Sequence, residues 1–127
     1  MKLLLDTHVL LWVAVQQSLS PSATAAFLDP NNELYLSAAS YWELCIKQSI
    51  GKLALMPNWV VVLDQVMLVN HIQWLPLTKA HCQKLVTLPL LHGDPFDRIM
   101  IAQALCENLT LLTADANIRQ YTVSTLW

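Results

Sequence analysis

Short apolar segments alternate with longer amphipathic ones along this chain. Four mainly apolar runs have the length and composition of buried strands, at residues 2–5, 34–36, 72–75 and 110–113. Six segments between them have helical patterns, at residues 9–15, 21–28, 37–50, 57–69, 78–86 and 94–107. Residues 121–126 predict a short edge strand. This alternation predicts an α/β sandwich with a mostly parallel sheet of four to five strands.

Capping residues mark the ends of several predicted helices. Ser20 followed by Pro21, and Asp94 followed by Pro95, are typical of an N-cap and a first helical position. Gly51 is typical of a helix C-terminus. The chain has no repeat, linker or low-complexity segment, so residues 1–127 are expected to form a single domain.

The composition of the chain predicts a partner. Hydrophobic residues make up 55% of the 127 residues and charged residues 13%, whereas a typical domain has about 45–50% and about 25%. This balance excludes intrinsic disorder. A domain of this size buries only about two-thirds of the surface that its unfolded chain exposes, so we expect apolar surface that belongs to a partner.

Several function classes are excluded at the level of motifs. Only two glycines are present, which leaves no phosphate-binding Gly-rich loop. The three cysteines are widely spaced, as are the four histidines, and neither set has the spacing of a disulfide framework or a soft-metal site. No apolar run reaches the roughly 18 residues of a membrane span. No signal-peptide pattern appears, so we expect a cytoplasmic protein.

Acidic residues follow the predicted strands. Asp6 directly follows the first strand, Asp115 comes two residues after the fourth, and Glu43 lies early in the helix after the second. Active sites of open α/β sheets lie beyond the carboxyl ends of the strands. Asp94 and Asp97 begin the helix that leads into the fourth strand, and they join this edge if the preceding loop returns there.

Three of these acids also have a purely structural interpretation, whereas Asp6, between an apolar strand and an apolar helix, is costly to desolvate without a partner. Ser40 and Glu43 have the spacing of a capping box, Glu43 and Lys47 that of a surface pair, and Asp94 with Asp97 suits a helix N-terminus. Taken together, however, clustered carboxylates repel one another unless cations compensate them. Mg²⁺ prefers such oxygen ligands, and two ions would suit phosphodiester hydrolysis.

Four sequence blocks resemble a known family. They are LLLDTHVLLW at residues 3–12, SAASYWELCIKQSIGKL at 37–53, HGDPFDRIMIAQA at 92–104, and LLTAD with YTV at 111–115 and 121–123. In this order and spacing they resemble the PIN-domain ribonucleases of the VapC type II toxin family. The match spans almost the whole chain.

The resemblance implies a PIN-like three-layer α/β/α sandwich that cuts RNA. It implies a catalytic, metal-binding set that holds Mg²⁺, with Mn²⁺ able to substitute: Asp6, Glu43, Asp97 and Asp115. Asp94 is an additional acid of this subgroup, with an open metal role. We expect four further residues to serve substrate binding, Thr7, Lys47, Arg98 and Thr113. Arg98 or Lys47 would contact a phosphate, and the hydroxyls of Thr7 and Thr113 would support the acids. The resemblance also implies a homodimer and a VapB-type antitoxin, which would share the apolar surface.

Other interpretations remain open at this point. A haloacid-dehalogenase-like phosphatase needs a second Asp where this chain has His8, and a response-regulator receiver needs an Asp where it has Leu36 and Ser37. A catalytically inactive PIN-fold binding module would act through its apolar surface alone. With the five acids set aside, seven basic residues face four acidic ones, which leaves +3 and favours a phosphate substrate. Any of the five tryptophans could stack on an RNA base.

Overall fold

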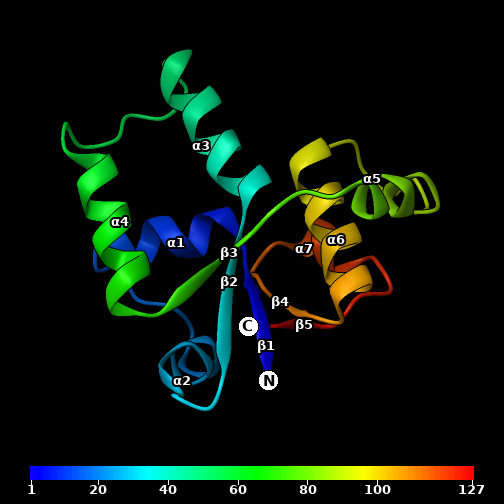
Figure 1. Cartoon of the computed structure of the whole chain (residues 1–127), viewed down its shortest axis with the longest axis horizontal. Helices are drawn as coiled ribbons and strands as arrows, with labels where there is room; N and C mark the ends of the chain where they lie inside the picture. The colour runs from blue at the N-terminus through cyan, green and yellow to red at the C-terminus, as the bar shows by residue number, and fades with distance from the viewer.

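The computed structural model describes residues 1–127 and has a five-stranded, fully parallel sheet in the order β3-β2-β1-β4-β5 (Figure 1). The strands are β1 (Lys2–Leu5), β2 (Glu33–Ser37), β3 (Ile72–Leu75), β4 (Thr110–Leu112) and β5 (Thr125–Leu126). The helices are α1 (Thr7–Ala14), α2 (Pro21–Leu28), α3 (Ala38–Ser49), α4 (Trp59–Val69), α5 (Lys79–Val86), α6 (Pro95–Glu107) and α7 (Ala116–Arg119). The predicted α/β/α sandwich is confirmed, and its sheet is entirely parallel.

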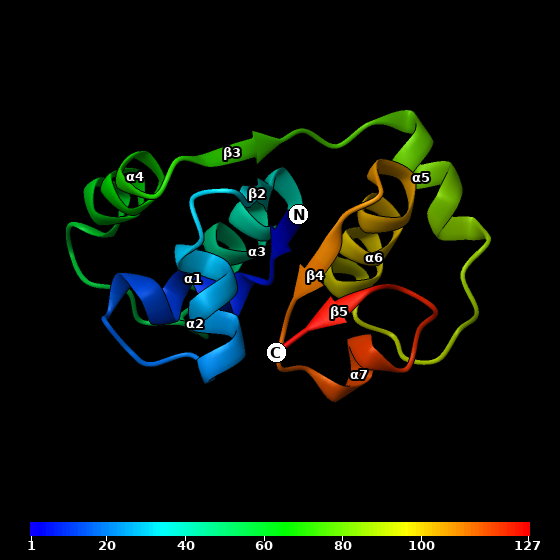
Figure 2. The same cartoon turned by 90° about the horizontal axis from the view of Figure 1, so that it is seen from below.

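Two apolar cores lie on opposite faces of the sheet because side chains alternate along each strand. Leu3 and Leu5 of β1 pack in one core with side chains of α1, α2, α3 and α4, while Leu4 packs in the other with α6 and α7. Figures 1 and 2 show the same division, with α1, α2 and α4 on one side of the sheet and α5, α6 and α7 on the other. The fold therefore has three layers.

Strand β1 is the centre of the structure. It pairs with β2 on one side and β4 on the other, and Leu3, Leu4 and Leu5 are completely buried. Each such side chain contributes about 1.5–3 kcal/mol through burial. The unbroken apolar run is explained by this position, because a central parallel strand is covered on both faces.

The strand order creates a crevice where β1 ends. From β1 the chain moves to β2 and β3, and it then returns across the sheet to β4 on the other side of β1. A sheet has a topological switch point where the connections of two neighbouring strands leave in opposite directions. Ligands of open α/β sheets bind there, beyond the carboxyl ends of the strands. The residues that follow β1 and β4 lie at this point.

Three local predictions differ from the structure. Helix α7 was not predicted, because a single turn capped by Asp115 is too short for a periodic pattern. Strand β5 is confined to Thr125–Leu126, within the predicted residues 121–126. The capping box of Ser40 and Glu43 is wrong: Ser37 caps α3 by accepting from the Ala39 N–H, and Ser40 lies inside the helix. None of the helices has both the length and the apolar character needed to cross a membrane.

Candidate active site

Acidic side chains from four parts of the chain gather at the switch point. The first turns of α3 and α6 lie at the same edge of the sheet as the ends of β1 and β4 (Figure 1). Helix α6 also begins at this edge (Figure 1), and its N-cap is Asp94. The acids that the fold brings to this edge are Asp6, Glu43, Asp94, Asp97 and Asp115. This is the convergence that the sequence predicts.

Asp6 is held in place at the end of β1. The residue is 4% exposed, its Oδ2 accepts a 2.7 Å hydrogen bond from Thr113 Oγ1, and His8 Nδ1 lies 3.8 Å from its Oδ1. Burial alone raises the pKa of Asp6, but the His8 side chain and the Thr113 hydroxyl stabilise the carboxylate and bring its pKa below the ordinary value. Asp6 therefore remains ionised at neutral pH.

Glu43 lies inside the site rather than on the surface of α3. It is 4% exposed, its Oε1 accepts a 2.8 Å hydrogen bond from Thr7 Oγ1, and its Oε2 lies 3.0 Å from Lys47 Nζ. The predicted pair with Lys47 forms, but one partner is buried. The hydrogen bond to Glu43, together with the negative charges of Asp94 and Asp97, raises the pKa of Lys47. The ammonium group thus partly compensates the acids.

Asp97 has the most perturbed carboxyl group of the cluster. Burial raises its pKa, a hydrogen bond from His92 opposes the rise, and repulsion from Asp94, Asp6 and Asp115 adds to it, so that the pKa reaches about 6. Its Oδ2 lies 3.1 Å from His92 Nε2. A carboxyl group in this state indicates a site that is short of positive charge.

Asp94 and Asp115 combine a local role with their place in the cluster. Asp94 Oδ1 accepts from the backbone N–H groups of Phe96 and Asp97, as expected for the N-cap of α6. Asp115 Oδ1 accepts from the Asn117 N–H at the start of α7. In both residues the Oδ2 atom remains available to a ligand.

Comparison with known proteins identifies the family. The family model of the PIN domain matches residues 3–123. This chain belongs to the PIN-domain family. It is 31% identical over 120 residues to ribonuclease VapC22 of Mycobacterium tuberculosis (strain ATCC 25618 / H37Rv), a match that covers 93% of this chain and 90% of that protein. This relationship assigns the PIN domain to the VapC type.

Solved structures share the fold of this PIN domain. VapBC2 of Rickettsia felis, bound to a DNA fragment from its promoter, superposes with a TM-score of 0.78 at 16% identity, over 99% of this chain and 98% of that one. VapBC-1 of nontypeable Haemophilus influenzae has a TM-score of 0.61 at 18% identity, over 99% and 97% of the two chains. At these identities the likeness concerns the fold alone.

Two residues that the sequence does not single out lie directly behind the acids of the PIN domain. His92 contacts Asp97, and Tyr121 contacts both His92 and Arg98. Arg98 is 9% exposed, and its Nη1 donates to Tyr121 Oη and to the Pro89 carbonyl, each at 2.9 Å. These contacts give Arg98 a supporting position beneath the site, not the phosphate-facing position expected from sequence. In the sequence, the only indication that His92 contacts an acid of the site is its position shortly before Asp94 and Asp97.

The clustered carboxylate oxygens of the PIN domain suit a hard divalent cation, although they do not form a complete set of metal ligands by themselves. No three His, Cys, Asp or Glu side chains are grouped closely enough to hold one metal ion. Mg²⁺, however, is usually bound by one or two carboxylates together with waters and substrate oxygens. The raised pKa of Asp97, caused by burial and by its acidic neighbours, is the electrostatic condition that such a cation would relieve.

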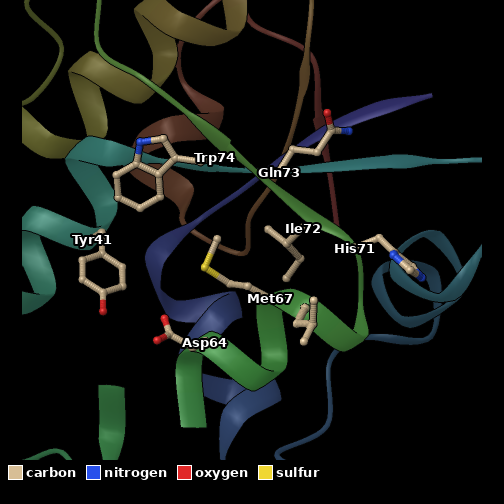
Figure 3. Close-up of a pocket in the computed structure, with 8 residues that line it drawn as sticks. Tyr41, Asp64, Met67, His71, Ile72, Gln73 and Trp74 are labelled. Carbon is tan, nitrogen blue, oxygen red and sulfur yellow. The ribbon is translucent and has the colours of Figure 1, made fainter. Parts of the chain in front are cut away.

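A wide cavity of the PIN domain lies away from these acids. It has a volume of about 820 Å³ and lies between α4 and β3, beside α3 (Figure 3). Figure 3 shows the rings of Tyr41 and Trp74 on one side of it, with Asp64 and Met67 of α4 nearby. None of the clustered acids lines this cavity, which is mainly apolar. The clustered acids are therefore separate from this cavity.

Proposed function

We propose that this PIN domain is a Mg²⁺-dependent endoribonuclease that acts as the toxin of a VapBC type II toxin–antitoxin system in the cytoplasm. The observation that carries the proposal is the gathering of five carboxylates at the switch point of a parallel sheet, where one of them has a pKa of about 6. Ionised acids in such numbers are unfavourable for folding. Their retention at one edge is explained if they bind cations and a phosphate substrate.

Asp6, Glu43, Asp97 and Asp115 would supply the carboxylates, one or two to each cation beside water and phosphate oxygens. Asp94 is a further acid of the cluster. When bound, Mg²⁺ supplies a water of lowered pKa and stabilises negative charge on the phosphate group. The chain itself supplies orientation: the Thr113 hydroxyl fixes one oxygen of Asp6. The Thr7 hydroxyl does the same for Glu43. Mn²⁺ has the same ligand preference and is expected to substitute.

An RNA substrate is supported by groups around the acids. Lys47 lies beside Glu43 with 39% of its side chain exposed, so its ammonium group can reach a phosphate. Trp42 is 61% exposed and packs edge to face against Phe96, with ring centroids 5.5 Å apart. Trp42 and Phe96 directly precede Glu43 and Asp97 in the sequence, so the ring pair lies next to these two acids along α3 and α6. Unpaired RNA bases bind by stacking on such rings.

An antitoxin and a second copy of the chain are the partners that we assign to the apolar surface. Helix α4 has only one fully buried side chain, Leu63, and several of its apolar residues are exposed. They are Val60, Val61, Leu68 and Val69. Exposed apolar surface of this kind is typical of a protein interface. One solved structure with this fold is a toxin–antitoxin complex from Klebsiella pneumoniae, which agrees with an antitoxin partner.

The proposal is tested with purified, antitoxin-free protein and single-stranded RNA. Cleavage is expected with Mg²⁺ or Mn²⁺, and it should stop when EDTA is added. Asp6→Asn and Asp97→Asn should each remove cleavage, while Asp64→Asn, at an exposed position of α4, should leave it unchanged. Cleavage that persists in both site variants would reject the assignment. Growth inhibition on expression, relieved by the same two substitutions, gives a second readout.

A catalytically inactive binding module is the alternative, and metal binding separates the two. Such a module would have no physical reason to keep clustered carboxylates that destabilise its fold. Isothermal titration with Mn²⁺ is expected to show binding at or below millimolar concentration. The absence of both binding and cleavage would favour the binding module, which would then act through its apolar surface alone.

A further inference from the structure

A chain of hydrogen bonds reaches Asp97 from the interior of the protein. Arg98 Nη1 donates to Tyr121 Oη at 2.9 Å. Tyr121 Oη lies 2.8 Å from His92 Nδ1, and His92 Nε2 lies 3.1 Å from Asp97 Oδ2. The imidazole ring thus connects a buried tyrosine to an acid of the candidate active site, and neither nitrogen is left without a partner.

The donors and acceptors around Tyr121 determine which nitrogen of His92 carries the proton. The phenol oxygen faces two groups that can only donate, Arg98 Nη1 at 2.9 Å and the backbone N–H of His92 at 3.3 Å. Its two acceptor positions are therefore used. Tyr121 is 5% exposed, and its remaining hydrogen-bond neighbour is Nδ1. The phenol proton must point there, so Nδ1 accepts and the neutral ring carries its proton on Nε2.

This tautomer directs an N–H group at Asp97. Nε2–H donates to Oδ2, while Oδ1 of Asp97 makes no hydrogen bond within the chain. One carboxylate oxygen is thus held from behind and the other is left for a ligand. The side chains behind His92 are held in place by packing. Arg98 and Tyr121 are both buried, and the guanidinium carbon of Arg98 lies 5.9 Å from the centroid of the Tyr121 ring.

We propose that His92 is a positioning residue for Asp97, with its tautomer fixed by Tyr121 and Arg98, so that Asp97 presents a preoriented oxygen to a divalent cation. The inference rests on the proposed function, because it assigns Asp97 to metal binding. Partners that orient a ligand in this way change metal affinity by about 10- to 100-fold when they are removed. In the sequence, His92 and Tyr121 belong to two of the four blocks that resemble the family, and neither has a role assigned from them.

The tautomer is tested without metal or RNA. Long-range ¹H–¹⁵N correlation spectra of metal-free protein, recorded where the ring is neutral, should show His92 protonated at Nε2 and unprotonated at Nδ1. In Tyr121→Phe, which keeps the ring and removes the hydroxyl, Nδ1 loses its proton donor and the two tautomers should exchange. A wild-type ring protonated at Nδ1, or a Tyr121→Phe spectrum identical to that of the wild type, would overturn the proposal.

The positioning role is tested by Mn²⁺ titration of His92→Leu and His92→Gln. Leucine leaves Oδ2 of Asp97 without a donor, and Mn²⁺ affinity should fall about 10- to 100-fold, with a lower kcat and an unchanged KM for RNA. Glutamine can place an amide N–H near the position of Nε2 and should restore most of the affinity. His71→Asn, at an exposed position with φ 53° that asparagine tolerates, is the control for loss of an imidazole elsewhere.

The outcomes separate this inference from the proposed function. If the wild type binds Mn²⁺ and cuts RNA while His92→Leu binds the ion equally well, the positioning role fails and the proposed function stands. If the wild type neither binds Mn²⁺ nor cuts RNA, both fail. Should His92→Leu not fold, Tyr121→Phe carries the test, because it keeps the aromatic ring, removes only the hydroxyl group, and is expected to weaken Mn²⁺ binding several-fold.

Discussion

Replacing Asp97 with asparagine is expected to stabilise the metal-free protein while it abolishes activity. The pKa of Asp97 rises from its ordinary 3.8 to about 6, first because the group is buried and further because Asp94, Asp6 and Asp115 repel its charge. One pKa unit corresponds to about 1.4 kcal/mol. The ionised carboxylate therefore costs the fold about 3 kcal/mol, which asparagine removes while its amide oxygen still accepts the hydrogen bond from His92 Nε2.

The sign of this effect depends on pH. Below about pH 4 the carboxyl group of Asp97 is protonated in both the folded and the unfolded protein, so it contributes nothing. Between about pH 4 and 6 the unfolded chain loses its proton while the folded protein keeps it, and stability falls as the pH rises. Above the pKa of Asp97 in the folded protein, the ionised carboxylate lowers the free energy of unfolding by its full amount. The increase in the free energy of unfolding caused by Asp97→Asn should therefore grow from near zero at about pH 4 to about 3 kcal/mol at about pH 7.5.

Urea unfolding in EDTA, followed by circular dichroism at both pH values, measures this difference. Asp64→Asn removes an equal charge from an exposed position of α4 and should change stability by less than about 0.5 kcal/mol. Addition of Mg²⁺ should stabilise the wild type and leave Asp97→Asn unaffected, because binding to the folded state adds to its stability. An Asp97→Asn protein no more stable than the wild type at about pH 7.5 would refute the electrostatic reasoning.

Three further predictions concern the groups around the acids. Thr113→Val should destabilise the protein by about 2 kcal/mol at neutral pH in urea unfolding, and less as the pH falls through the lowered pKa of Asp6, because the lost hydroxyl stabilises that carboxylate. Lys47→Gln should raise the KM for RNA in steady-state cleavage assays, and a similar rise in the control Lys52→Gln would argue against a specific phosphate contact. Trp42→Ala should weaken binding of single-stranded RNA by roughly 5- to 100-fold in fluorescence anisotropy, the equivalent of about 1–3 kcal/mol of base stacking, whereas the exposed Trp74→Ala should have no effect.

Much of the fold follows from local patterns. The apolar run of β1 predicted a buried parallel strand, and the caps Ser20 and Asp94 predicted the starts of α2 and α6, because an N-cap needs only a side-chain oxygen within three residues of the N–H that it accepts from. Local patterns fail where an element is very short or where two caps compete. Helix α7 is a single turn, and α3 is capped by Ser37 and not by Ser40.

The candidate site was only partly predictable, because local patterns identify the acids but not the side chains that contact them. The acids could be identified because strand ends and helix starts share one edge of a parallel sheet. Their partners could not, because these contacts join residues far apart in the chain: 36 positions separate Thr7 from Glu43, and 107 separate Asp6 from Thr113. Arg98 shows the difference most clearly, since its charge suggested a phosphate contact until packing placed the guanidinium group under Tyr121.

By itself, the sequence determined where the strands and all helices except α7 lie, which family the chain resembles, and that acids follow the strands. These properties depend on the order of polar and apolar residues and on hydrogen bonds within a few positions. The tertiary structure decided how those acids are held: the hydroxyls on Asp6 and Glu43, the pKa of Asp97, and the tautomer of His92. Each depends on burial and on atoms brought together from separate elements, and packing alone sets those distances.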